Sequence, residues 1–316
     1  MSDALSVVCA VRNGEKYVYK TISQIHSMLN SNDELIIIDD NSTDQSLRKI
    51  KNTIKKLQRV KVYSNKGNGL VDALNYGISK SKNPWIARVD IDDEYVIDRF
   101  NVQKKFLEES VAAVFCDYEF IDENSNSLGI MYSPVFHEAV VISLVNSQRT
   151  PHPGVIFSKD NFLKSQKYKK EDFPVEDLSL WLRLRNKGKL VSVPEKLMLY
   201  RISPKSVTSV SARKIATLRE ANLRKWIKQE EDLEFSKIRN ILLKYNLIPN
   251  YRPRQILFLY DAIKFCNLRR QRILCTILWL YMFKFIFTPQ GLIVTLKLLH
   301  QKKSRDKYRK SFYKDL

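Results

Sequence analysis

The stretch "ELIIIDDNSTDQSLRKIKNTIKKL", residues 34–57, joins an apolar run to a helix-like repeat through a short polar loop. Residues 34–39 form a continuous run rich in isoleucine, which predicts a strand buried on both faces. Serine, threonine and aspartate then supply the capping chemistry of a helix start, and apolar residues recur at helical spacing up to residue 57. The stretch therefore predicts one strand–helix unit of an α/β protein.

The same unit recurs through the first part of the chain. Apolar runs predict further strands at 5–11 ("LSVVCAV"), 60–64 ("VKVYS") and 84–89 ("PWIARV"), and helical spacing predicts helices at 15–29 and 69–81. Strands that alternate with helices of this length indicate βαβ crossovers. We therefore expect a mostly parallel central sheet with helices on both faces, and ligands beyond the carboxyl ends of its strands.

Charge divides the chain into two parts. The 316 residues carry a formal net charge of +20. Residues 1–210 hold 30 Lys and Arg against 26 Asp and Glu, whereas residues 211–316 hold 24 against 8. Strand signals also end near residue 205, after which helical periodicity continues. We expect a catalytic domain at 1–205 and a helical, basic region at 206–316.

The cysteines and the first residues point to one compartment. Cys9, Cys116, Cys266 and Cys275 show no CxxC spacing, so neither a zinc site nor a disulfide framework is predicted. The first five residues contain Asp3 and lead directly into a predicted strand, which is not the pattern of a signal peptide. We expect a cytoplasmic protein.

The segment "WIARVDIDDE", residues 85–94, ends a predicted buried strand with four carboxylates. An EF-hand loop would need glycine and glutamate where Tyr95 and Asn101 stand, which excludes that site. Two interpretations remain open on spacing alone. The acids belong to a helix start capped by Asp98, or Asp-x-Asp binds Mg²⁺ or Mn²⁺ together with substrate phosphates.

Six stretches together resemble the inverting family 2 glycosyltransferases, which have the GT-A fold and use nucleotide sugars. They occur in that family's order across residues 5–201. The stretches are "LSVVCAVRNGEKYV", "ELIIIDDNSTDQS", "NKGNGLVDALNYGI", "WIARVDIDDE…DRF", "TPHPGVIF" and "VEDLSLWLRLRNKGKLVSVPEKLMLYR".

The resemblance implies donor-binding roles for residues at the strand ends. Asp40 is similar to the residue that hydrogen-bonds uracil, with Asp39 supporting it. Asp90 and Asp92 match the DxD motif, in which Asp92 would ligate Mg²⁺ or Mn²⁺ and Asp90 would face the ribose and the hydrated ion. Arg12 stands where many relatives carry an aromatic residue, and its planar guanidinium can stack on a base.

The resemblance also implies an acceptor side. Asp177 matches the catalytic base, and Glu176 would line the acceptor site. His152 in "TPHPGV" and Arg201 in "LYR" fall where the family contacts donor or acceptor, while Ser203 stands where many relatives have a histidine. From pattern alone, acids that open a helix also suit any protein, because the helix dipole favours them there.

The last fifty residues carry a second signal. Residues 265–316 hold twelve Lys and Arg against two Asp, interleaved with apolar runs at 273–287 and 292–300. Both runs are too short to span a bilayer. Apolar helices flanked by cations favour an anchor on an anionic membrane surface, and a helical subdomain packed on the sheet is the alternative.

Together these features predict an inverting, metal-dependent transferase that moves one sugar from a nucleotide sugar, in the UDP class, to a lipid-linked saccharide. The family resemblance places it in bacterial surface-polysaccharide synthesis, peripheral on the inner face of the membrane. No Gln-x-x-Arg-Trp signature of processive synthases occurs. The alternatives are a sugar nucleotidyltransferase, whose Gly-rich phosphate loop is missing here, and a non-catalytic protein that binds membrane or nucleic acid.

Overall fold

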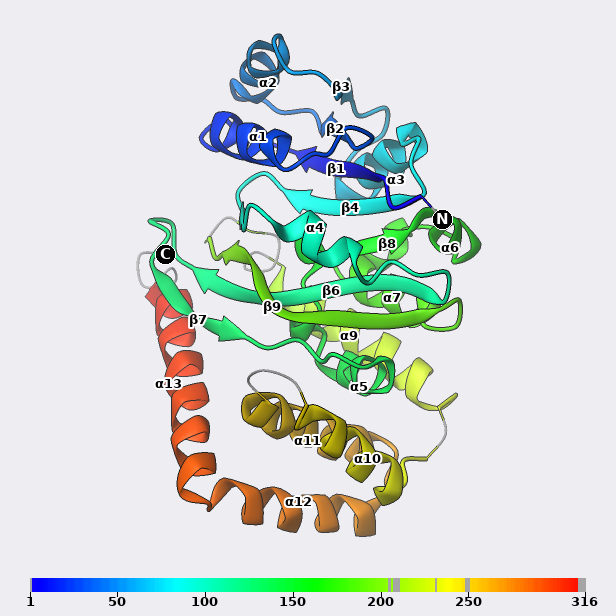
Figure 1. Ribbon diagram of the computed structural model, residues 1–316, viewed down its shortest axis with the longest axis vertical. Coiled ribbons are helices and arrows are strands. Elements are labelled where there is room, and N and C mark those ends of the chain that lie inside the picture. Colours follow the sequence, from blue (N-terminus) through cyan, green and yellow to red (C-terminus); the bar gives the residue numbers. More distant parts are fainter. Residues whose placement is uncertain (1, 204–205, 207–210, 231, 248–250, 312–316) are drawn as a thin grey trace.

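The computed structural model describes residues 2–203, 206, 211–230, 232–247 and 251–311 (Figure 1). Nine strands of this part of the chain form one sheet. They are β1 (Leu5–Val11), β2 (Glu34–Asp39), β3 (Val60–Ser64), β4 (Trp85–Asp90), β5 (Glu94–Tyr95), β6 (Val111–Ile121), β7 (Ser127–Met131), β8 (Ile156–Ser158) and β9 (Lys189–Arg201). Their order is β3-β2-β1-β4-β8-β6-β9-β5, with β7 paired to β6.

Helices connect the strands up to β9. They are α1 (Val18–Ser27), α2 (Ser46–Ile54), α3 (Leu70–Lys80), α4 (Arg99–Lys104), α5 (His137–Ser143), α6 (Lys159–Lys164) and α7 (Glu176–Leu184), with short 3₁₀ segments η1 (Leu144–Arg149), η2 (His152–Gly154) and η3 (Lys170–Asp172). Helix α1 begins later than the sequence predicts. The amides of Asn13 and Gly14 donate instead to the hydroxyls of Ser42 and Ser46, which ties this loop to the one after β2.

The strands β3, β2, β1 and β4 are parallel neighbours, and their register aligns the acidic residues. Val11 pairs with Asp39, and the adjacent Ala10 pairs with Asp90. Both acidic clusters therefore lie at one carboxyl edge, as the sequence predicts. The β6–β9 pair is parallel too, whereas β8, β5 and β7 are antiparallel to their neighbours. The predicted mostly parallel sheet is confirmed.

Alternate residues of β1 enter two different cores, so helices cover both faces of the sheet. Leu5, Val7 and Cys9 pack in one core with α1 and α4. Val8 faces the other way into a core that holds residues of α3 and α7. Figure 1 shows α1 and α4 in front of the sheet and α3 and α7 behind it. This is the two-faced arrangement that a parallel sheet with crossover helices requires.

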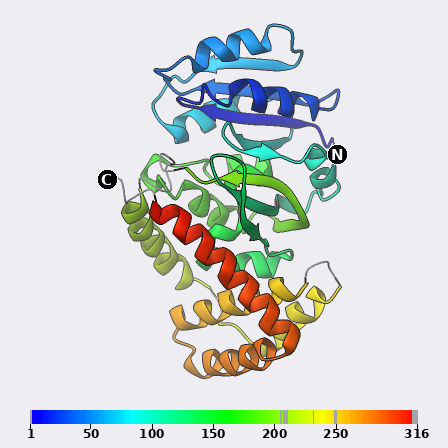
Figure 2. The same cartoon turned by 90° about the vertical axis from the view of Figure 1, so that its left-hand side faces the viewer.

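The end of the chain is helical throughout its described residues. Its helices are α9 (Ala212–Ile227), α10 (Phe235–Tyr245), α11 (Tyr251–Leu268), α12 (Arg272–Ile286) and α13 (Pro289–Ser311). Helix α13 runs from α12 back to β7 (Figures 1 and 2). Side chains of α9, α10 and α11 share one core with β6 and α7. A domain boundary at 205/206 stays a prediction, because residues 204 and 205 lie outside the described part.

Buried ion pairs join α11 to the sheet region. Arg254 donates to both carboxylate oxygens of Asp117 on β6 and to the carbonyl of Ser133 at 2.7 Å. Arg149 Nε lies 3.3 Å from Asp261 Oδ2, and both side chains are buried. We call this group the β6–α11 seam. In the described residues no helix is both long enough and apolar enough to cross a bilayer.

Candidate active site

The acidic loop directly follows β4. Carboxylate oxygens of Asp90, Asp92 and Asp93 lie within 4.8 Å of one another. Burial raises the pKa of all three carboxyl groups. The neighbouring carboxylates add to this effect at Asp92, whose pKa is raised to about 6, and at Asp93. Three carboxylates so close together repel one another in the absence of a cation.

The carboxylate oxygens of this loop are suitable ligands for a divalent cation. Hard cations such as Mg²⁺ and Mn²⁺ take carboxylate oxygens. Asp90 is engaged by Arg88 at 2.6 Å, and Asp93 Oδ1 accepts from the amide of Arg201 at 2.7 Å. No described residue donates a hydrogen bond to the Asp92 carboxylate apart from its own backbone. Asp92 therefore has the carboxylate least engaged by the protein, and its role as a metal ligand stays a prediction. Asp98 begins α4, but its carboxylate accepts from the Asn101 side chain, so it does not cap the helix.

Arg88 is a site residue that the sequence analysis missed. It lies on β4, its side chain is buried, and its charge acts on Asp90, Glu176, Asp177 and His152. The donor-side and acceptor-side acids therefore share one electrostatic neighbourhood. Its only sequence signal is a charged residue in the middle of an apolar strand, which is unusual unless the charge is paired.

The loop after β2 meets the loop after β3. Asp40 Oδ1 accepts from Asn65 Nδ2 at 2.7 Å and from the Gly69 amide at 3.0 Å. Its Oδ2 lies 4.0 Å from Arg12 Nη1, and the Arg12 side chain is mostly exposed. Asp39 is buried beside them. Asn65 and Gly69 position Asp40. Both residues lie in the stretch "NKGNGL", whose sequence gives no sign of these contacts.

The opposite side of the site is the start of α7. Glu176 is buried, and burial together with the adjacent Asp177 raises its pKa to about 8. Burial also raises the pKa of Asp177, whose Oδ1 accepts from the amide of Leu178 at 2.7 Å. A carboxylate whose pKa is raised toward the working pH is a better proton acceptor. This arrangement suits a general base at Asp177.

His152 lies in η2 against these acids. Its Nε2 shares a hydrogen bond of 2.7 Å with the hydroxyl of Tyr168, and its Nδ1 lies 3.8 Å from Glu176 Oε1. Burial, together with the charge of Arg88, lowers the pKa of His152 well below its usual range. His152 is therefore neutral at pH 7. Tyr168 is a second residue that the sequence did not single out.

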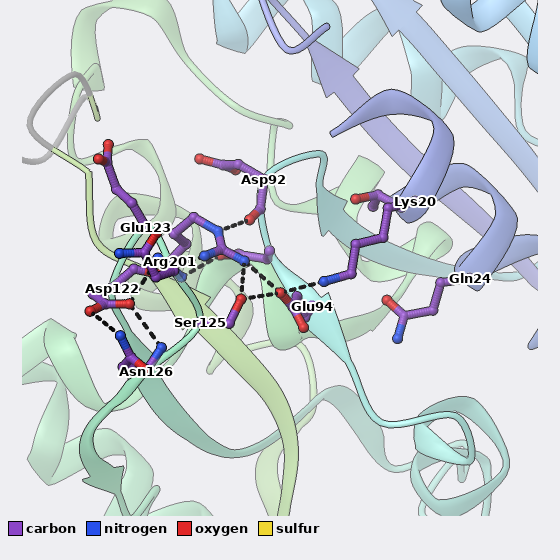
Figure 3. Close-up of polar contacts among 12 residues, drawn as sticks. Lys20, Gln24, Asp92, Glu94, Asp122, Glu123, Ser125, Asn126 and Arg201 are labelled. Carbon is purple, nitrogen blue, oxygen red and sulfur yellow. Dashed lines mark hydrogen bonds and ion pairs between the residues drawn. The ribbon is translucent and has the colours of Figure 1, made fainter. Parts of the chain in front are cut away.

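Arg201, the last residue of β9, lies beside Asp92 and Glu94 of the acidic loop (Figure 3). Its Nε donates to the carbonyl of Asp92 at 2.8 Å, and its Nη2 donates to Glu94 Oε1 at 2.6 Å. Its sequence motif groups it with the acceptor-side residues. The structure places it against the backbone of the acidic loop.

Three residues of the site keep a buried polar atom without a partner. Asp39 Oδ1, Arg88 Nε and Glu176 Oε2 are buried and have no hydrogen-bond partner among the described residues. Buried polar atoms are almost always hydrogen-bonded in folded proteins. These three atoms are available to a polar ligand bound between the loops.

Comparison with known proteins identifies the family. Residues 6–185 match the family model "Glycosyl transferase family 2". The O-antigen biosynthesis glycosyltransferase WbnJ of Escherichia coli is 32% identical over 238 residues, which cover 74% of this chain and 92% of WbnJ.

Solved structures share the fold. TarS 1-349 of S. aureus in complex with UDP-GlcNAc has a TM-score of 0.59 at 18% identity, covering 97% of this chain and 92% of TarS. The mannosyltransferase PcManGT from Pyrobaculum calidifontis, in complex with GDP-Man and Mn²⁺, has a TM-score of 0.53 at 12% identity, covering 96% and 86%. Because identity is low, these two structures support the fold alone. The family model and WbnJ decide against the sugar nucleotidyltransferase and the non-catalytic binder, and this chain belongs to glycosyltransferase family 2.

Proposed function

We propose that the chain transfers a single sugar from a nucleotide sugar, in the UDP class, to a saccharide acceptor with inversion at the anomeric carbon. The observation that carries this proposal is the shared neighbourhood of the Asp-x-Asp loop and Asp177 around Arg88. A donor bound along the carboxyl edge has its diphosphate at Asp92 and its base near Asp40. The acceptor approaches from the side of α7.

The residues divide the chemistry between them. A bound Mg²⁺ or Mn²⁺ neutralises charge on the leaving diphosphate. Asp177 takes the proton of the acceptor hydroxyl as that oxygen attacks, which makes a weak nucleophile effective. Glu176, with its pKa of about 8, stays protonated at neutral pH and offers a hydrogen-bond donor to the acceptor. One base and a single displacement give inversion.

We infer further that the acceptor is lipid-linked and belongs to surface-polysaccharide synthesis. Support comes from WbnJ, a protein named for O-antigen biosynthesis. Support also comes from the α12–α13 face, by which we mean the exposed apolar side chains of these two helices. They include Ile273, Leu280, Phe283, Leu292, Ile293, Leu296 and Leu299, and we add Phe287, which directly follows α12.

The α12–α13 face suits an anionic membrane surface. Residues 262–305 contain no Asp or Glu but nine Lys and Arg. Apolar side chains at the lipid boundary and cations near anionic headgroups act together in interfacial binding. We propose that the enzyme works peripherally on the inner face of the membrane through this surface.

A vesicle assay tests the surface. The intact protein should co-sediment with vesicles rich in anionic phospholipid, and less with neutral vesicles or at high salt. Leu280→Ser combined with Phe287→Ser should weaken this binding, whereas Leu247→Ser, at a residue 86% exposed in α10's trailing turn, should not. If the intact protein ignores vesicles, or self-associates through this face in sizing experiments, the membrane proposal is wrong.

NMR of the reaction tests the transfer itself. With Mn²⁺, a UDP-sugar and a saccharide acceptor, the new bond should have the anomeric configuration opposite to the donor's. Asp92→Asn should remove turnover and metal-dependent donor binding. A retained configuration, or full activity in excess chelator, would contradict the proposed mechanism.

A further inference from the structure

We propose that Arg201 is a positioning residue that holds the metal-binding loop in place, and that it is not itself a ligand of donor or acceptor. The inference rests on the proposed metal site at Asp92. It changes the role that the family resemblance suggests for Arg201, from a substrate contact to a support for the acidic loop.

The hydrogen bonds of Arg201 leave little for a substrate. A guanidinium has five N–H donors. In Arg201 four of these N–H groups donate to protein atoms. Nε donates to Asp92 O at 2.8 Å and Nη1 donates to Asp122 O at 2.6 Å. Nη2 donates to Glu94 Oε1 at 2.6 Å and to Ser125 Oγ at 3.1 Å. The side chain is 3% exposed. One N–H on Nη1 remains.

These bonds connect three separate segments. The acidic loop 92–94 receives one bond from Nε and one from Nη2, and the backbone amide of Arg201 donates to Asp93 at 2.7 Å. The turn 122–126 between β6 and β7 receives the other two (Figure 3). The bond from Nε fixes the carbonyl of Asp92. Fixing that carbonyl restricts where the Asp92 carboxylate points.

Glu94 keeps the guanidinium in place. Its Oε1 also accepts from Lys20 Nζ at 2.7 Å and from Ser125 Oγ at 2.7 Å. The turn is rigid in its own right, since Asp122 accepts from the amides of Asn124 and Asn126. Arg201 is therefore anchored on both sides, and a planar fork of this kind loses its geometry when lysine replaces it.

The bonds of Arg201 also counteract the repulsion within the acidic loop. Three carboxylates within 4.8 Å of one another push the loop apart. Arg201 opposes this with a nearby positive charge and with bonds to three consecutive residues of the loop, Asp92, Asp93 and Glu94. Residues that orient metal ligands in this way are worth about 10–100-fold in metal affinity.

Arg201→Lys tests the proposal, with Arg269→Lys as the matched control. Arg269 also binds one carboxylate, Asp232, and one carbonyl, Ile227 O, but lies in the C-terminal helices. Hydrogen exchange measured by mass spectrometry should become faster at residues 91–95 and 122–126 in Arg201→Lys only. The Kd for Mn²⁺ in the presence of UDP should rise at least about tenfold. At saturating Mn²⁺, kcat should stay within about threefold of the parent value.

Glu94→Gln provides a second variant should Arg201→Lys fold poorly. It should change exchange and Mn²⁺ affinity in the same direction but less, and the double variant should lose less than the sum of the two. Unchanged exchange and unchanged Mn²⁺ affinity, with a large loss of kcat at saturating metal, would overturn the proposal and favour direct substrate contact. If the parent protein binds no Mn²⁺, the proposed metal dependence fails, and the exchange data alone then decide the positioning role.

Discussion

Two groups of charges in this chain, one half-buried and one buried, are built in opposite ways. Residues 90–93 crowd three carboxylates at the carboxyl edge of the sheet. At the β6–α11 seam, Asp117 receives Arg254 and Asp261 faces Arg149. Like charges crowded together reduce the stability of the fold. In a buried pair of opposite charges each charge is compensated, and the loss of one partner leaves the other buried without compensation. The acidic edge therefore indicates a binding site, and the seam indicates a structural joint.

The largest effect should come from Asp177→Asn, at the start of α7 across the site from the acidic edge. Loss of a general base lowers kcat by roughly a hundred- to ten-thousandfold. Asparagine keeps an oxygen that can accept from the Leu178 amide, so Tm and donor affinity should change little. Steady-state kinetics and thermal unfolding measure the two quantities. Lost stability with normal turnover per folded molecule would mean that Asp177 only supports the helix start.

At the β6–α11 seam we expect the opposite result, a loss of stability without a loss of turnover. Asp117→Asn leaves Arg254 buried without its charge partner, which costs about 3–5 kcal/mol of unfolding free energy. Turnover per folded molecule should be unchanged. The control is Glu220→Gln, which breaks the exposed Glu220–Arg224 pair and should cost below about 0.5 kcal/mol. Urea unfolding measures both losses. Equal losses of unfolding free energy in the two variants would mean that the buried seam pair stabilises the fold no more than an exposed pair does.

A smaller effect should appear in the pH dependence of stability. The pKa of Glu176 is raised to about 8 in the fold, so the folded state binds more protons than the unfolded state between about pH 4.3 and 8. Stability therefore falls as pH rises through this range. Glu176→Gln should reduce that slope by up to about 1.4 kcal/mol per pH unit. An unchanged slope in unfolding measured at pH 5 to 8 would mean that Glu176 titrates normally.

Much of the fold could be predicted because its signals are local. The apolar runs predict β1 to β4, and their alternation with helices predicts that Asp39 and Asp90 meet at one edge. The antiparallel β8 has three residues, too few for a periodic signal. The helical character of the last hundred residues was also readable from the sequence. How those helices pack on the sheet was not.

The site was predictable only in part, since its supports depend on tertiary contacts. Family resemblance points to the acids of the site because their motifs are short and ordered. Arg88 contacts Asp90 because residues two apart in a strand share one face of the sheet. Arg201 is 109 residues from Asp92 in sequence, and the two meet because β9 and β5 pair. Spacing in the sequence contains no trace of the contact between Arg201 and Asp92.

The most direct test of the central claim is the position of the metal. A crystal of the full chain with Mn²⁺ and UDP should show an anomalous peak at the acidic edge, with Asp92 as a ligand at about 2.0–2.3 Å. The diphosphate should complete the coordination, and the base should lie toward Asp40. A peak elsewhere, or a nucleotide bound at another face with residues 90–93 empty, would contradict the account.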